Sequence, residues 1–169
     1  MKLNTLFFSL FIGGCALMAS CTSQKENVNE TDASDSIPVN TSGYDSTKAA
    51  EVGADEYGMK SYVLAFLYRG DQEITDSLER ARLQRAHLDN INRLAEEGKL
   101  VLAGPFLDKQ DLRGIYIFNT SSIDSAASWT NTDPAIIANW LKMELKPWYG
   151  SAALVELNSR HSIFAKTNI

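Results

Sequence analysis

The sequence predicts an α+β domain whose strands and helices follow one another in the order β-α-β-β-α-β. Residues 61–68 are rich in aromatic and branched apolar residues, as in a strand. Residues 77–97 have apolar positions at helical spacing. Residues 99–118 contain two short apolar runs separated by a polar turn, as in a hairpin. We therefore expect an antiparallel sheet with helices packed against it.

The first helix has the clearest pattern of the predicted elements. Asp76 or Ser77 can cap its start, and Gly98 supplies its end. A single stripe along the helix is expected to be buried. That stripe consists of Leu83, His87, Ile91, Leu94 and Ala95.

The elements after this helix complete the predicted order. They are a short strand at residues 99–103, a turn at 108–112, a return strand at 113–118, a helix from 122 to about 132, a helical turn at 135–138 and a strand at 140–146. A β-α-β-β-α-β chain of this kind forms the ferredoxin-like arrangement, with both helices on one sheet face. The other face carries residues such as Tyr62, Leu64 and Phe66, and an uncovered apolar face of this size requires a partner surface. We therefore predict a homodimer in which two sheets pair as a dimeric α+β barrel.

The N-terminal residues are typical of an export signal. Lys2 precedes an apolar run at residues 6–14, which is shorter than the roughly 20 residues that a membrane span needs. Residues 17–21 (LMASC) resemble the lipobox of bacterial lipoproteins, although Met18 stands where Leu is usual. We predict a signal peptide over residues 1–20, lipidation at Cys21 and, because Thr22 follows, a lipid anchor in the outer rather than the inner membrane of a bacterial cell envelope. Cys15 is a weaker candidate, and the alternative is an ordinary secretory signal with an incidental cysteine.

Charge separates the next segment from the folded part. Residues 22–57 hold eight acids and two lysines among small polar residues, so we expect a disordered acidic tether over residues 21–57. The expected domain follows at residues 58–158, with a C-terminal tail at 159–169. From residue 58 onward acids and Lys plus Arg number thirteen each, without a basic patch, so nucleic acid is not an expected partner.

His87 is the main candidate for chemistry because a titratable side chain interrupts an apolar stripe. A lone histidine there is more often a satisfied core residue than a catalyst. Asp133 precedes Pro134 after the second helix and could be only a turn residue. In the predicted fold, however, Asp133 comes beside the first helix and can hydrogen-bond His87, which would fix the imidazole tautomer for proton transfer.

Several blocks of the chain together resemble the YCII (YciI-like) family. They are residues 87–94 (HLDNINRL), residues 97–106 (EGKLVLAGPF), Gly114, Asp133-Pro134 and residues 146–148 (KPW). The resemblance runs from about residue 62 to 148. It implies a dimeric α+β barrel and a His–Asp pair, here His87 and Asp133. The family is similar to muconolactone isomerase and includes a dehydrochlorinase of chlorinated hydroxyquinols. This chain departs from it in its N-terminal signal and in the added residues 151–157.

Together these features predict a small-molecule lyase or isomerase in which His87 is the acid–base and Asp133 orients it. Gly104 and Pro105 are expected at the rim of the pocket, and Arg80 is the expected contact for an anionic substrate. We expect no cofactor, and no metal site because the two histidines lie far apart and the domain has no cysteine. The alternatives are a non-catalytic binder of small ligands and a lipoprotein that acts by protein contact.

Overall fold

The computed structural model describes residues 43–167, which all belong to one compact unit. Its four strands are β1 (Met59–Arg69), β2 (Leu100–Pro105), β3 (Leu112–Phe118) and β4 (Leu141–Ser151). They form one antiparallel sheet in the order β2-β3-β1-β4. The ferredoxin-like α+β fold predicted from the sequence is therefore confirmed.

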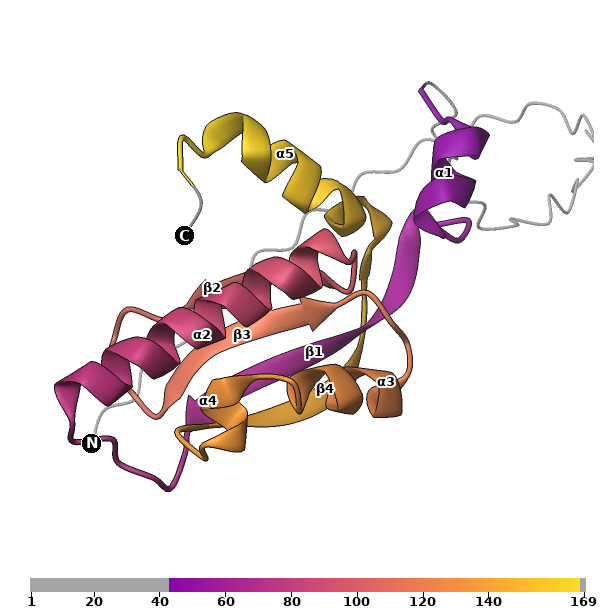
Figure 1. Ribbon diagram of the computed structural model, residues 1–169. Helices are drawn as coiled ribbons and strands as arrows, with labels where there is room; N and C mark the ends of the chain where they lie inside the picture. Colours follow the sequence, from indigo (N-terminus) through magenta and orange to yellow (C-terminus); the bar gives the residue numbers. More distant parts are fainter. Residues whose placement is uncertain (1–42, 168–169) are drawn as a thin grey trace, which may run out of the picture. The chain divides into compact units, whose positions relative to one another are not determined.

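The helices α2 (Ser77–Glu96), α3 (Ile123–Thr130) and α4 (Pro134–Ile137) lie over one face of the sheet (Figure 1). Each begins at a capping side chain that accepts a backbone N–H bond, namely Asp76, Ser122 and Asp133. The cap at Asp133 places this aspartate between α3 and α4, and the same side chain belongs to the candidate site.

The main core lies between this sheet face and the helices. β1 contributes Val63, Ala65 and Leu67, which alternate with residues on the other face. Leu94 of α2 and Phe118 of β3 are buried against them. Of the stripe expected on this helix, Leu83, His87 and Leu94 are buried, whereas Ile91 and Ala95 are half-buried. Asn90, which was not part of the expected stripe, is buried as well.

The second face of the sheet is covered at one end, which corrects the expectation that it would be bare in a single chain. Tyr62, Val101 and Ile117 form a second cluster there. Leu154 and Val155 pack against it from the 3-10 helix η1 (Ala152–Glu156). Within the added residues 151–157, this helix therefore closes part of the face. Leu64 and Phe66 stay half-buried on the same face.

The folded part begins earlier than the predicted boundary at residue 58. Helix α1 (Ser46–Val52) lies in the segment expected to be a disordered tether. Asp45 caps its start, Gly53 ends it in a left-handed conformation, and the Lys60 ammonium donates to the Val52 carbonyl oxygen at 3.0 Å. Local capping and this side-chain bond order a segment whose composition alone predicts disorder.

The expected signal peptide, Cys15, Cys21 and tether residues 21–42 lie outside the described residues. At the other end, α5 (Leu157–Phe164) crosses the predicted boundary between domain and tail. Among residues 43–167, no helix is long and apolar enough to span a membrane.

Candidate functional site

His87 and Asp133 meet in the interior, as the sequence predicted. Nδ1 of His87 lies 2.7 Å from Oδ2 of Asp133, and both residues are buried, with Asp133 fully so. The other carboxylate oxygen of Asp133 accepts the backbone N–H of Ala135 at 2.9 Å, where it caps α4. Asp133 is therefore both a turn residue that caps α4 and the hydrogen-bond partner of His87.

The carboxylate determines which imidazole nitrogen carries the proton. An ionised Asp133 only accepts, so Nδ1 of His87 must donate to it. In the neutral ring Nε2 is then an acceptor. The hydroxyl of Tyr116 lies 3.3 Å from Nε2 and supplies the donor. Asp133, His87 and Tyr116 thus form one directed chain of hydrogen bonds.

Tyr116 is a functional candidate that our sequence reasoning missed. It is buried on β3, and its ring lies nearly parallel to the imidazole, at 21° with centroids 6.3 Å apart. Burial, with a smaller contribution from the charge of Asp133, raises the pKa of Tyr116 well above its ordinary value. The phenol therefore keeps its proton and can donate to Nε2. In the sequence it looks like any strand aromatic.

A second set of contacts fixes the loop that carries Asp133 to α2. The Arg93 guanidinium donates to Oδ1 of Asn90 and to Oγ1 of Thr132, both at 2.8 Å. Thr132 immediately precedes Asp133, and Asn90 is one turn after His87 on the buried stripe. The arginine therefore holds the two halves of the pair together. Asn90 lies next to Ile91 of the expected stripe, and its burial was not predicted.

A cavity of about 670 Å³ opens beside this hydrogen-bond chain. His87, Gly104, Pro105 and Arg80 all line it, so the structure brings these predicted residues together, whereas Asp133 lies behind the imidazole. Arg80 is exposed at the edge, and its guanidinium bonds the Ile74 carbonyl oxygen at 3.4 Å.

The cavity wall between β2 and β3 depends on a close approach of two backbones. A Cβ at Gly114 would lie 2.6 Å from the carbonyl oxygen of Gly104, closer than a side chain tolerates. A Cβ at Gly104 would meet no heavy atom within 4 Å. Gly114 is therefore the glycine that the wall requires, while the predicted rim residue Gly104 has room for a methyl group.

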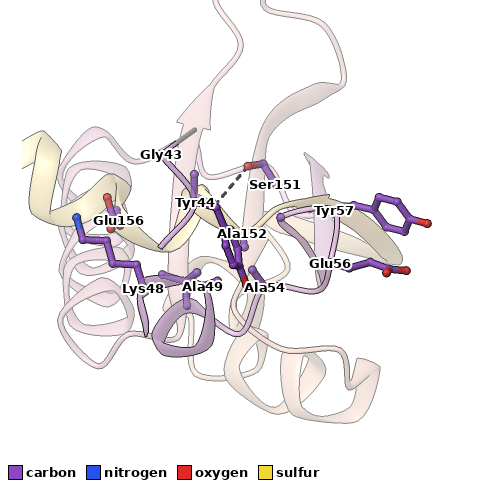
Figure 2. Close-up of a pocket in the computed structure, with 13 residues that line it drawn as sticks. Gly43, Tyr44, Lys48, Ala49, Ala54, Glu56, Tyr57, Ser151, Ala152 and Glu156 are labelled. Carbon is purple, nitrogen blue, oxygen red and sulfur yellow. Dashed lines mark hydrogen bonds between the residues drawn. The ribbon is translucent and has the colours of Figure 1, made fainter. Parts of the chain in front are cut away.

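A second cavity, of about 530 Å³, lies between α1 and η1 (Figure 2). Tyr44, Lys48 and Ala49 line one side of it, and Ala152 and Glu156 line the other. No predicted site residue belongs to this cavity. In residues 43–167, no three His, Cys, Asp or Glu side chains are grouped as metal ligands would be.

Comparison with known proteins places most of the folded part of the chain in a family. The model of the YCII-related domain family matches residues 62–149. This range includes β2, β3, most of β1 and β4, and every residue that lines the 670 Å³ cavity. The chain therefore belongs to the YCII-related domain family.

A solved structure is also similar to part of the chain. It is 5-chloro-2-hydroxyhydroquinone dehydrochlorinase from Burkholderia phenoliruptrix AC1100, in complex with 2,5-dihydroxybenzoquinone. It shares 26% identity over 50% of this chain and 92% of its own, with a TM-score of 0.37. No curated protein matches the chain.

Proposed function

We propose that this protein is a lyase or isomerase acting on a small molecule, with His87 as the acid–base. The observation that carries the proposal is the buried 2.7 Å contact between His87 and Asp133 at the wall of the 670 Å³ cavity. A carboxylate behind an imidazole orients the ring and stabilises the imidazolium that forms when Nε2 takes a proton.

The proton follows a simple route in this proposal. Nε2 removes a proton from a carbon next to a carbonyl group of the substrate, and the C–H electron pair moves into an enolate. An isomerase returns the proton from His87 to another carbon, whereas a lyase expels a leaving group from the neighbouring carbon. The Tyr116 hydroxyl, which donates to Nε2 at rest, must turn away toward the substrate or pass the proton on.

Turnover of a panel of lactones and hydroxyquinols tests the proposal. We expect His87→Gln to lower turnover of an accepted substrate by roughly 10²–10⁴-fold, the usual contribution of a general acid–base. His161→Gln is the matched control, because His161 is exposed on α5. Urea unfolding of both variants reports folding. Full activity in a folded His87→Gln variant would exclude this role.

A non-catalytic ligand-binding role is the second candidate, favoured by one observation. Nε2 of His87 already has the Tyr116 hydroxyl as its partner, and only 8% of His87 is exposed. A binder would use this hydrogen-bond chain to recognise a polar group without moving a proton. Ligand binding without turnover, weakened equally in His87→Gln and Tyr116→Phe, is the result that this role predicts.

We also propose that the chain is exported and anchored through a lipid on Cys21, in the outer membrane of a bacterial cell envelope. The support is the apolar run at residues 6–14 and the lipobox-like LMASC at residues 17–21. Mass spectrometry of membrane-extracted protein should find a diacylglyceryl group on residue 21, and Cys21→Ala should release the protein to a soluble fraction. An intact, unmodified Met1 on the mature protein would refute the anchor.

We propose a homodimer through the partly covered sheet face. Leu64, Phe66 and Ile115 are half-buried there. A charge in this patch should separate the copies, so Phe66→Glu is expected to halve the mass measured by light scattering. Leu78→Glu is the control, since Leu78 is 80% exposed on the other side of the fold. A monomeric unsubstituted protein at micromolar concentration would contradict the proposal.

A further inference from the structure

Arg113 is a cationic residue of the cavity that the proposed reaction leaves unused. It lies on β3, three residues before Tyr116, and it lines the cavity that His87 also lines. Its side chain is half-buried, and its guanidinium has no ion-pair or hydrogen-bond partner among residues 43–167. A guanidinium removed from part of its water gains most from a carboxylate or a similar anion.

The other charged groups of the lining differ from Arg113. Glu73 is exposed, so its charge is screened by water. The remaining three, Arg69, Asp71 and Arg80, are exposed as well, and each has a contact within the protein. These pairs are Arg69 with Asp111 (3.7 Å), Asp71 with Lys142 (3.2 Å) and Arg80 with the Ile74 carbonyl oxygen (3.4 Å). Arg113 is therefore the half-buried charged side chain of the described lining, and water screens its charge less than that of the exposed ones.

The rest of the wall suits an apolar ligand body. The same lining contains large apolar side chains. They are Leu67, Leu88, Ile91, Trp140 and Leu141. Arg113 and Tyr116 are three positions apart in β3, so their Cα atoms lie at most about 10 Å apart. That span fits a molecule about the size of one ring with a charged group at one end.

We propose that the ligand of this cavity is a small organic anion whose carboxylate, or ionised enol oxygen, binds the guanidinium of Arg113. The body of the ligand lies on the apolar wall, and its other end faces His87 and Tyr116. This inference rests on the proposed function for the identity of the site, and it names the chemical class of the substrate. The planar guanidinium of an arginine can donate two parallel N–H hydrogen bonds to the two oxygens of a carboxylate.

Benzoate and its neutral isostere benzamide test this class of ligand without any turnover. In calorimetric titration of the full chain, we expect benzoate to bind about tenfold to a hundredfold more tightly than benzamide, as charge-assisted hydrogen bonds do. Added salt should reduce the difference. Arg113→Gln should abolish it, and Arg113→Lys should keep part of it.

Arg82→Gln is the matched control, because Arg82 binds Glu79 on the exposed side of α2 and does not line the cavity. It should leave the preference for benzoate unchanged. Urea unfolding shows whether the Arg113 variants fold. If Arg113→Gln does not fold, the reduced preference for benzoate expected of Arg113→Lys still tests the inference. Equal binding of the two probes, no measurable benzoate binding, or a preference that survives in Arg113→Gln would overturn the inference.

The same variants separate this inference from the proposed function. His87→Gln should retain the preference for benzoate, because Arg113 is intact. If the preference depends on Arg113 but no folded His87 variant affects turnover of an accepted substrate, the catalytic proposal fails and the anion site stands. If His87 is essential for turnover but the two probes bind equally, the anion site fails alone.

Discussion

Replacing Asp133 by alanine removes two hydrogen bonds from a fully buried position. One oxygen binds Nδ1 of His87 at 2.7 Å, and the other caps α4 through the N–H of Ala135 at 2.9 Å. A hydrogen bond to a charged group contributes about 1.5–3 kcal/mol and a helix N-cap about 1 kcal/mol. We therefore expect Asp133→Ala to lower the free energy of unfolding by about 2.5–4 kcal/mol.

Asp133→Asn separates the charge from the shape. An asparagine oxygen still caps α4, so that contribution is kept. Its amide then donates toward Nδ1 of His87, which requires the tautomer with the proton on Nε2. Nε2 donates in turn to the Tyr116 oxygen, so the direction of the chain reverses. We expect a smaller loss of about 1–2 kcal/mol, because the bond persists without its charge.

Equilibrium urea unfolding near neutral pH measures the free energies, and ¹⁵N NMR of the imidazole nitrogens reports the tautomer. Asp111→Ala is the control, since its ion pair with Arg69 is exposed and long at 3.7 Å and should contribute little. Equal destabilisation by alanine and asparagine at position 133, or an unchanged tautomer in Asp133→Asn, would refute the assigned directions of the hydrogen bonds.

Further predictions concern the wall, the core and the surface. Gly114→Ala should lower the free energy of unfolding by about 1–3 kcal/mol, because the new Cβ meets a backbone oxygen. Gly104→Ala should change this free energy little. A larger effect at Gly104 than at Gly114 in urea unfolding would contradict the prediction. Phe118→Ala should lower the free energy of unfolding by about 3–5 kcal/mol in the same measurement, because the ring is fully buried in the main core. A decrease below about 1 kcal/mol would argue against this packing. The Tyr149 hydroxyl donates to Asp55 and, with two backbone N–H bonds, holds the pKa of Asp55 below its ordinary value of 3.8. Because that pKa is lowered by folding, the stabilisation exists above 3.8 and is lost as the pH falls through the folded value. Tyr149→Phe should move the Asp55 pKa part of the way back toward 3.8 in an NMR titration, and an unchanged value would exclude the contact.

The best-predicted parts of the fold are those whose signals are local. The helix expected at residues 77–97 is observed as Ser77–Glu96, with Asp76 as its cap. The start of this helix depends on one side chain that accepts a nearby backbone N–H bond. The buried stripe depends on the 3.6-residue periodicity of the apolar positions. The strand expected at 61–68 is observed as Met59–Arg69, because its residues alternate between two buried faces.

Elements stabilised by distant partners were misjudged. The last strand was expected at 140–146 but continues to Ser151, through Pro147. β4 is an edge strand paired with β1 on one side only, so a proline that lacks an N–H is tolerated there. Residues 43–57 resemble a tether in composition, but the Lys60 side chain and η1 hold them in place.

By itself the sequence determined the order of the elements, the caps and the burial of His87, because each depends on residues within a turn or two of one another. Only the tertiary structure decided that Tyr116 faces Nε2, that Arg113 lines the same cavity and that residues 154 and 155 close part of the second sheet face. Tyr116 lies 29 positions from His87 in the chain. The His87–Asp133 pair, 46 positions apart, could be predicted only through the expected fold and the family resemblance. Local patterns carry no information on such distances, because the register of the sheet and the packing of α2 against it determine which side chains meet.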